Sequence, residues 1–515
     1  MAIDKKYYIN TGGDGVLEDT TEDDVRALVA DLKNASKLVI HLHGGLVSKV
    51  SALKTAERLH PFYEQAGVHP VFMVWESSLL ESVRNNLGEI NKEEIFRILV
   101  KKVMQYAVGK LKDLAGGKAS GQLALPNDIT VAKEFKNREE EKEPFENIKA
   151  SPALQDLNDA ERKKFEDSLA ADPDFRKELQ AIVNGAVSAN EKKETSKGIT
   201  GVHRKSSKTL MSPEVVDELV AEHKEKKGKG VLVVAKAVAK AVAKAGKILW
   251  SVIHRYREGR DHGLYATVVE EIFREFYIAN IGAAVWGFMK TDTADTFENF
   301  GGQPARGGWF FIQELGRLLK GGHKLEVSVV GHSCGCVYAS NLLRHLDWAR
   351  RNGIHPLPKD FRLKNLIFLA PACSFSQFDE VLSLHRQSPL FDHFRLFALK
   401  DELESGYWEV PVVYPRSLLY LVSGALEKEG EKSAYDLPLV GMERYFTAAA
   451  VYQQPEVKRL RQFLSEASNR RAEVWSEEDR GAGLASDVIE HSGFDETNDR
   501  RKTMVSVQHI LQNGW

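Results

Sequence analysis

Ser333 is the residue whose neighbours best suit nucleophilic chemistry. In residues 327–336 a β-branched run stops at Gly-His-Ser-Cys-Gly, and a helical pattern begins at Val337. This order predicts a strand that turns sharply into a helix, with the serine hydroxyl exposed at the turn. The flanking glycines let strand and helix approach closely, and the backbone N–H of Cys334 then points at an oxyanion forming on the substrate. The alternative is a tight glycine turn that holds an ordinary serine.

A second glycine turn follows an early strand. Residues 38–43 form a buried-strand pattern that runs into Gly44, Gly45 and Leu46. Together the two turns resemble the α/β-hydrolase superfamily, in which a His-Gly loop supplies a second oxyanion donor. The resemblance implies that this donor is the backbone N–H of Gly45 or Leu46, alongside that of Cys334. It covers about residues 36–76 and 307–511.

The same resemblance implies a carboxylic acid after a later strand. The superfamily order is serine, acid, histidine. The predicted strand 394–399 ends just before Asp401, which is therefore the expected acid. Glu402 and Glu404 are the competing carboxylates, and the alternative is that all three begin a solvated turn.

The expected general base is His491, which lies in a loop after the last predicted strand. His509 is also near the C-terminus, but it falls within a helical pattern and is expected to be a packed structural residue. By the triad template, Ser333 attacks an acyl carbon, and His491 takes its proton and returns it to the leaving group. Asp401 orients the imidazole and stabilises its charge.

The pattern of elements predicts an α/β fold. Strands alternate with helices at both ends of the chain, which indicates a mostly parallel central sheet with helices on both faces. Residues 1–90 and 300–515 are expected to form this catalytic domain, interrupted by a helical insert over 91–299 that is partly flexible, at 138–144 and 188–207. The predicted strands are 38–43, 70–75, the run before Ser333, 365–370, 394–399 and 472–476.

Composition excludes several classes of function. The 515 residues carry a formal net charge of −2, so no nucleic-acid partner is expected. Three cysteines, with no apolar leader and no long apolar run, favour a cytoplasmic location. No cofactor is expected, because there is neither a phosphate-binding loop nor a dinucleotide fingerprint. A metal site at His41 and His43 is a weak alternative, and none is expected.

The insert contains one unusual helix. Lys236, Lys240, Lys244 and Lys247 recur at helical spacing within an Ala/Val/Lys tract. This amphipathic pattern suggests either peripheral membrane contact through residues 231–250, or a helix packed on the protein with a solvated lysine face. The shortage of Trp and Phe on its apolar face favours the packed helix.

These residues predict a serine hydrolase that cleaves carboxylic esters through an acyl-enzyme. The apolar, helical insert favours a small-molecule or lipid ester with a long acyl chain as the substrate. One alternative is a non-catalytic scaffold of the same fold that binds partners through the insert. Another is an acyltransferase or peptidase with the same triad.

Overall fold

The computed structural model contains two compact units. It describes residues 3–45, 47–75, 80–113, 125–149, 153–195, 209–225, 230–278, 281, 283–298, 306–427, 436–466, 470–498 and 501–514. The first unit, the α/β unit, comprises residues 1–81, 285–405 and 438–515. The second, the helical unit, comprises residues 82–284 and 406–437.

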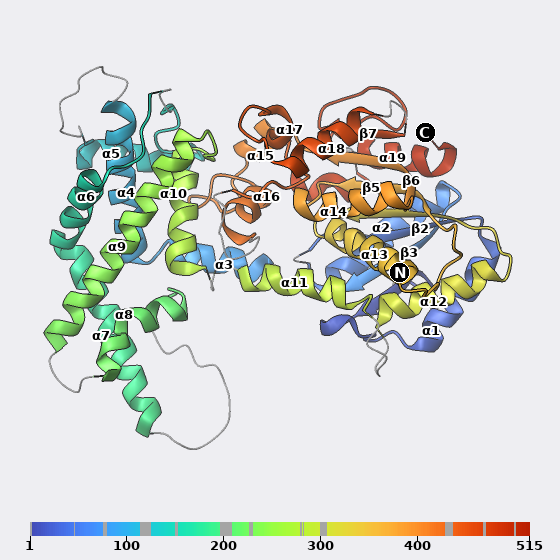
Figure 1. The fold of residues 1–515 in the computed structure, drawn as a ribbon, viewed down its shortest axis with the longest axis horizontal. Helices are drawn as coiled ribbons and strands as arrows, with labels where there is room; N and C mark the ends of the chain where they lie inside the picture. The colour runs from blue at the N-terminus through green and yellow to red at the C-terminus, as the bar shows by residue number, and fades with distance from the viewer. Residues whose placement is uncertain are drawn as a thin grey trace. The chain divides into compact units, whose positions relative to one another are not determined.

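A seven-stranded, all-parallel sheet forms the centre of the α/β unit, in the order β1-β3-β2-β4-β5-β6-β7 (Figure 1). The strand that precedes Ser333, β4, is the central one. The carboxyl end of a central strand is where ligands bind in open parallel sheets. The strands are β1 Tyr8–Thr11, β2 Lys37–Leu42, β3 His69–Trp75, β4 Glu326–His332, β5 Leu363–Leu369, β6 Phe391–Ala398 and β7 Arg471–Trp475.

Alternation of side chains along the strands covers both faces of the sheet. Ile367 and Leu369 of β5 point into a core that also contains side chains of α2 and α19. Phe368, between them, points to the other face, where its ring lies 5.1 Å from that of Phe378 in α14. Helices therefore bury both faces, as the nearly continuous apolar strands require.

Helices connect the strands of the α/β unit. Its longer helices are α1 Glu22–Asp31, α2 Lys49–Gln65, α12 Gly307–Lys320, α13 Gly335–Arg351, α14 Phe375–Gln387, α18 Pro455–Ser465 and α19 Lys502–Asn513. The predicted α/β class with a parallel sheet is confirmed. The edge strand β1 was missed, because it has four residues and pairs with β3 alone.

The helical unit is built around the long helix α9, which contacts five of its neighbours. Its main helices are α4 Glu94–Asp113, α5 Asp128–Lys136, α6 Asp159–Ala171, α7 Pro173–Thr195, α8 Pro213–Glu225, α9 Gly230–Arg257 and α10 Leu264–Ile272. Two π-helical turns, η5 Phe273–Tyr277 and η6 Val422–Leu426, also belong to it.

The apolar face of α9 is buried within the helical unit, with Ala241, Ala245 and Leu249 fully enclosed. Lys244 pairs with Glu218 at 3.0 Å, and Lys247 pairs with Glu275. These contacts are those of a packed helix with partnered lysines. Membrane contact through residues 231–250 stays a prediction.

The boundaries of the units differ from the expected ones in three places, the first of which is residues 82–90, part of the helical unit. Residues from Val285 onward belong to the α/β unit, and residues 406–437 belong to the helical unit. The last of these segments was not foreseen because it interrupts the later half of the α/β pattern. Within the first stretch expected to be flexible, Asn137–Glu140 forms a helical turn in which Arg138 donates to the Tyr265 hydroxyl at 2.9 Å. Helix α7 extends to Thr195, and residues 196–208 lie outside the described part.

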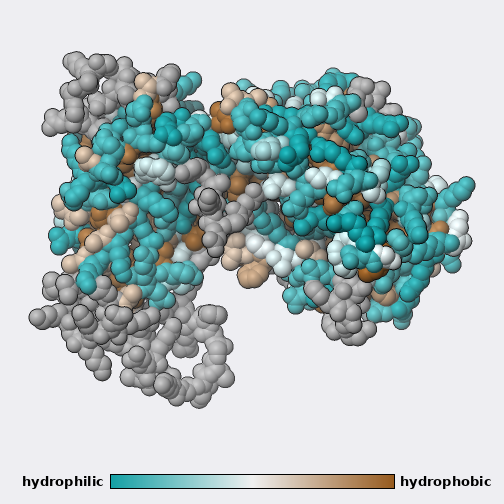
Figure 2. Space-filling model, in the orientation of Figure 1, coloured by the Kyte–Doolittle hydropathy of each residue, from teal (hydrophilic) through white to brown (hydrophobic). Residues whose placement is uncertain are grey.

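Among the described helices, none has both the length and the apolar character that crossing a membrane requires. The face drawn in Figure 2 is mainly hydrophilic, with small, separate groups of hydrophobic residues. The two most exposed large apolar side chains, Ile129 and Phe288, belong to different units.

Candidate active site

Ser333 occupies a strained turn between β4 and α13. Its φ angle is +52°, which side chains other than glycine rarely adopt. Its backbone N–H donates to the Leu369 carbonyl at 2.8 Å, which fixes the turn to the neighbouring strand. A methyl group on Gly335 would overlap the Leu42 carbonyl, and one on Gly331 would lie 2.8 Å from the Gly335 carbonyl oxygen. The glycines are therefore required by the close approach of backbone on both sides of the serine.

His491 lies directly against the serine. Its Nε2 is 2.9 Å from Ser333 Oγ, a hydrogen-bond distance, across 158 residues of sequence. The residue begins the short 3₁₀ helix η7, His491–Asp495. Burial and the neighbouring charge of His332 lower the pKa of His491 to about 3. The imidazole is therefore neutral at pH 7, and its Nε2 is able to accept the serine proton.

The ring of His491 is not fixed through its other nitrogen. Nδ1 is enclosed, and it makes no hydrogen bond with any residue that the structure describes. The predicted acid Asp401 begins α15, Asp401–Gly406, and its backbone N–H donates to the Glu443 carboxylate at 2.7 Å. The structure thus brings Ser333 and His491 together, but neither Asp401 nor its competitors Glu402 and Glu404 hydrogen-bonds to His491.

Asp495 is the carboxylate whose charge acts on His491. Its Oδ2 lies 3.3 Å from His332 Nδ1, and its Oδ1 is 3.2 Å from Arg58 Nη2. Burial alone raises the pKa of Asp495, but His332 and Arg58 outweigh it and lower that pKa to about 2. Sequence reasoning missed both Asp495 and His332. Each lies within four residues of a predicted catalytic residue in the chain, but nothing in the sequence pairs the two with each other.

The predicted oxyanion loop packs against the elbow. A methyl group on Gly45 would lie 2.6 Å from Cys334 Cβ, and one on Gly44 would lie 3.6 Å from Ser333 Cβ. Cys334 caps α13 at its N-terminus, where backbone N–H groups favour negative charge. Gly45 is therefore close to Cys334 and Gly44 is close to Ser333, while Leu46 lies outside the described residues.

The two early histidines make contacts within the protein. His43 accepts a hydrogen bond at Nε2 from the Trp75 backbone N–H at 3.3 Å and stacks on the Trp75 ring at 3.8 Å. His41 Nδ1 is 2.8 Å from the Tyr63 hydroxyl. Burial lowers the pKa of His41 to about 3 and that of His43 to about 4, so both are neutral packing residues at pH 7.

One group of carboxylates has the spacing of a metal site within the described chain. The side-chain oxygens of Asp14, Asp292 and Asp295 lie within 4.8 Å of one another. Such clusters are common on protein surfaces without an ion.

His509 forms no part of the site, since it lies in α19 and contacts the Asn513 side chain at 3.2 Å.

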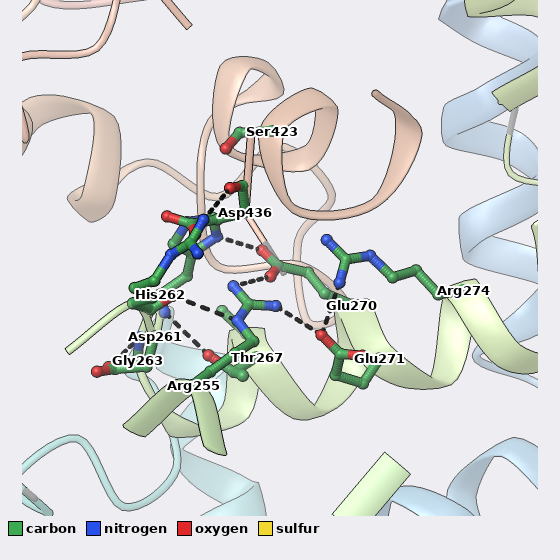
Figure 3. Close-up of polar contacts among 12 residues, drawn as sticks. Arg255, Asp261, His262, Gly263, Thr267, Glu270, Glu271, Arg274, Ser423 and Asp436 are labelled. Carbon is green, nitrogen blue, oxygen red and sulfur yellow. Dashed lines mark hydrogen bonds and ion pairs between the residues drawn. The ribbon is translucent and has the colours of Figure 1, made fainter. Parts of the chain in front are cut away.

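The helical unit contains a second dense group of polar side chains (Figure 3). Arg255 is fully buried and pairs with Glu270 at 2.8 Å and with Glu271 at 2.9 Å. Glu270 also lies 2.8 Å from His262 Nδ1 and accepts from the Tyr414 hydroxyl at 2.7 Å. Burial alone raises the pKa of Glu270, yet His262 and Arg255 hold it well below its ordinary value.

Further contacts close this group. Arg260 donates to Asp436 at 2.6 Å, and Arg274 donates to Glu271 at 2.9 Å. The π-helical turn η6 brings Gly424 so close to Glu270 that a methyl group would overlap the carboxylate. We call this group the buried charge cluster: Arg255, Arg260, His262, Glu270, Glu271, Arg274, Tyr414 and Asp436.

Comparison of the chain with protein-family models, with curated proteins and with solved structures gives no match.

Proposed function

We propose that this chain is a serine hydrolase of the α/β-hydrolase type that cleaves carboxylic esters through an acyl-enzyme. The single observation that carries the proposal is the 2.9 Å contact between Ser333 Oγ and His491 Nε2 at a turn with a φ angle of +52°. A nucleophile within hydrogen-bond reach of a neutral base, on a strained turn, is the arrangement that acyl transfer requires.

The chemistry follows from this contact. His491 Nε2 takes the proton as Ser333 Oγ attacks the ester carbon, and the carbonyl oxygen becomes an oxyanion beside Cys334 and Gly45. The intermediate collapses when His491 returns the proton to the leaving alcohol, which leaves an acyl-serine. Water then attacks the acyl-serine by the same route, giving the carboxylic acid and the free hydroxyl. We extend the proposal to lipid or long-chain acyl esters, because the insert is helical and largely apolar inside.

Labelling by a fluorophosphonate probe tests the proposal. The wild-type chain should bind one equivalent of probe and hydrolyse p-nitrophenyl esters, whereas Ser333→Ala should do neither. Ser465→Ala is the matched control, because Ser465 is exposed on α18 and its hydroxyl donates only to the Gln462 carbonyl. Labelling of Ser333→Ala at the wild-type rate would refute the assignment. A series of p-nitrophenyl esters of increasing chain length separates long-chain from short-chain preference.

A further inference from the structure

His332 joins the two segments that carry the nucleophile and the base. It is the residue before Ser333, and its side chain is 8% exposed. Its Nδ1 lies 3.3 Å from the Asp495 carboxylate, and its Nε2 lies 3.1 Å from the backbone carbonyl oxygen of His491. The ring thus contacts both ends of η7.

Both of these partners are hydrogen-bond acceptors. A backbone carbonyl only accepts, and a carboxylate with a pKa of about 2 is ionised at neutral pH and also only accepts. A neutral imidazole carries one N–H and would present a lone pair to one of the two oxygens. Hydrogen on Nε2 lets His332 donate to the His491 carbonyl, and hydrogen on Nδ1 lets it donate to the Asp495 carboxylate.

The position of His491 needs such an anchor. Its Nδ1 has no partner among the described residues, so its ring is not oriented in the way that the triad template provides. Instead, the backbone of η7 is held at both ends. His332 contacts the carbonyl of the first residue, and Arg58 lies 3.2 Å from the side chain of the last.

We propose that His332, paired with Asp495, is a positioning residue that holds the catalytic base by the backbone carbonyl of His491; this inference rests on the proposed function. Its contribution is to keep His491 Nε2 within reach of Ser333 Oγ. Displacement of a catalytic group by about 1 Å costs about a hundredfold in rate, so loss of the anchor should lower kcat more than it alters KM.

Two substitutions separate the two nitrogens of His332. The amide nitrogen of Gln falls near the position of Nε2 and is able to donate to the His491 carbonyl, whereas that of Asn falls near Nδ1 and serves only Asp495. With p-nitrophenyl butyrate, His332→Asn should lower kcat by about a hundredfold with KM changed less than about threefold. The kcat of His332→Gln should be at least about tenfold higher than that of His332→Asn. The matched control is His393→Asn, at a half-buried histidine of β6 that contacts the Lys364 carbonyl.

Equal activity of the wild-type, Asn and Gln chains would overturn this inference, as would an Asn variant more active than the Gln variant. If His332→Asn does not fold, Asp495→Asn replaces it and should lower kcat by about tenfold, and an unchanged kcat would overturn the inference. An active wild-type chain that loses turnover in Ser333→Ala keeps the proposed function standing whichever way the His332 variants behave. An inactive wild-type chain would overturn both.

Discussion

The surroundings of Ser333 and the buried charge cluster both enclose polar side chains, but they satisfy them differently. In the charge cluster, Arg255 and Glu270 are fully buried and 2.8 Å apart. Arg255 also donates to Glu271, and Glu270 accepts from the Tyr414 hydroxyl. At the active site, the Ser333 hydroxyl contacts only His491 among the hydrogen bonds of the described residues, and His491 Nδ1 has no such partner. The cluster compensates its buried charges with opposite charges, whereas the site holds a neutral base beside a hydroxyl.

This difference separates a structural from a chemical use of buried polarity. Removal of one charged side chain from a buried ion pair leaves the other charge uncompensated. Substitutions in the cluster should therefore lower the stability of the fold. A strained turn with an incompletely bonded base is the state in which a nucleophile is prepared for substrate, so the site should matter for rate. Substitutions in each region should therefore give opposite patterns of effect.

The largest effect is expected on rate at the active site. His491→Ala removes the group that we propose takes the serine proton, and kcat should fall by about 10⁴-fold, equivalent to about 5 kcal/mol. Its melting temperature should stay within a few degrees of wild type. His509→Ala is the control, and a greater loss in that variant would move the base to α19.

The next effect is expected on the stability of the helical unit. Glu270→Gln keeps the shape of the side chain but leaves Arg255 without a full counter-charge, which should cost about 3–5 kcal/mol. Denaturant unfolding measures this cost, and kcat of the folded variant should match wild type. Tyr414→Phe removes one hydrogen bond to the same carboxylate and should cost about 1 kcal/mol. Equal costs in the two variants would contradict a charge-based role.

A smaller effect is expected from pH on the α/β unit. The pKa of Asp495 is about 2 when folded, below its ordinary value of 3.8, because of His332 and Arg58. The lowered pKa stabilises the folded state by about 2 kcal/mol, and this contribution is complete above about pH 5. It is lost as the pH falls through 3.8 towards 2. Unfolding of wild type and Asp495→Asn between pH 2 and 7 should show this loss in wild type alone. Asp392→Asn, at a half-buried carboxylate of β6 that pairs with Arg362, should keep the wild-type dependence.

The smallest effect is expected at Asp401. Since this carboxylate is not hydrogen-bonded to His491, Asp401→Asn should change kcat by less than about threefold. Steady-state turnover of p-nitrophenyl butyrate measures it. A fall of about a hundredfold or more would restore Asp401 as the acid and would show that the base moves towards it in the catalytic state.

The elements that bear local signals were predictable from the sequence. The β-branched run before Gly331 and the helical pattern from Val337 predicted the elbow, and the loop position of His491 predicted its contact with Ser333. The prediction of the elbow and the prediction of the contact between His491 and Ser333 depend on patterns of a few adjacent residues and on the order of elements in a parallel sheet.

Features that depend on long-range packing were not predictable. The ion pair between His332 and Asp495 joins residues from β4 and η7, and neither residue type at its position signals the other. The same holds for residues 406–437, which join the helical unit although they follow a strand of the α/β unit. Their place is set by tertiary contacts such as that of Tyr414 with Glu270, 144 residues away.

The most direct test of the central claim is to trap the acyl-enzyme. The wild-type chain is mixed rapidly with p-nitrophenyl butyrate and quenched in acid, and its mass and peptides are then measured. The account predicts a burst of p-nitrophenol equal to the enzyme concentration and one butyryl group on the peptide that contains Ser333. Turnover of the ester with no acyl group on that peptide would contradict the account. Equal acylation of the wild-type chain and of the Ser333→Ala variant would also contradict it.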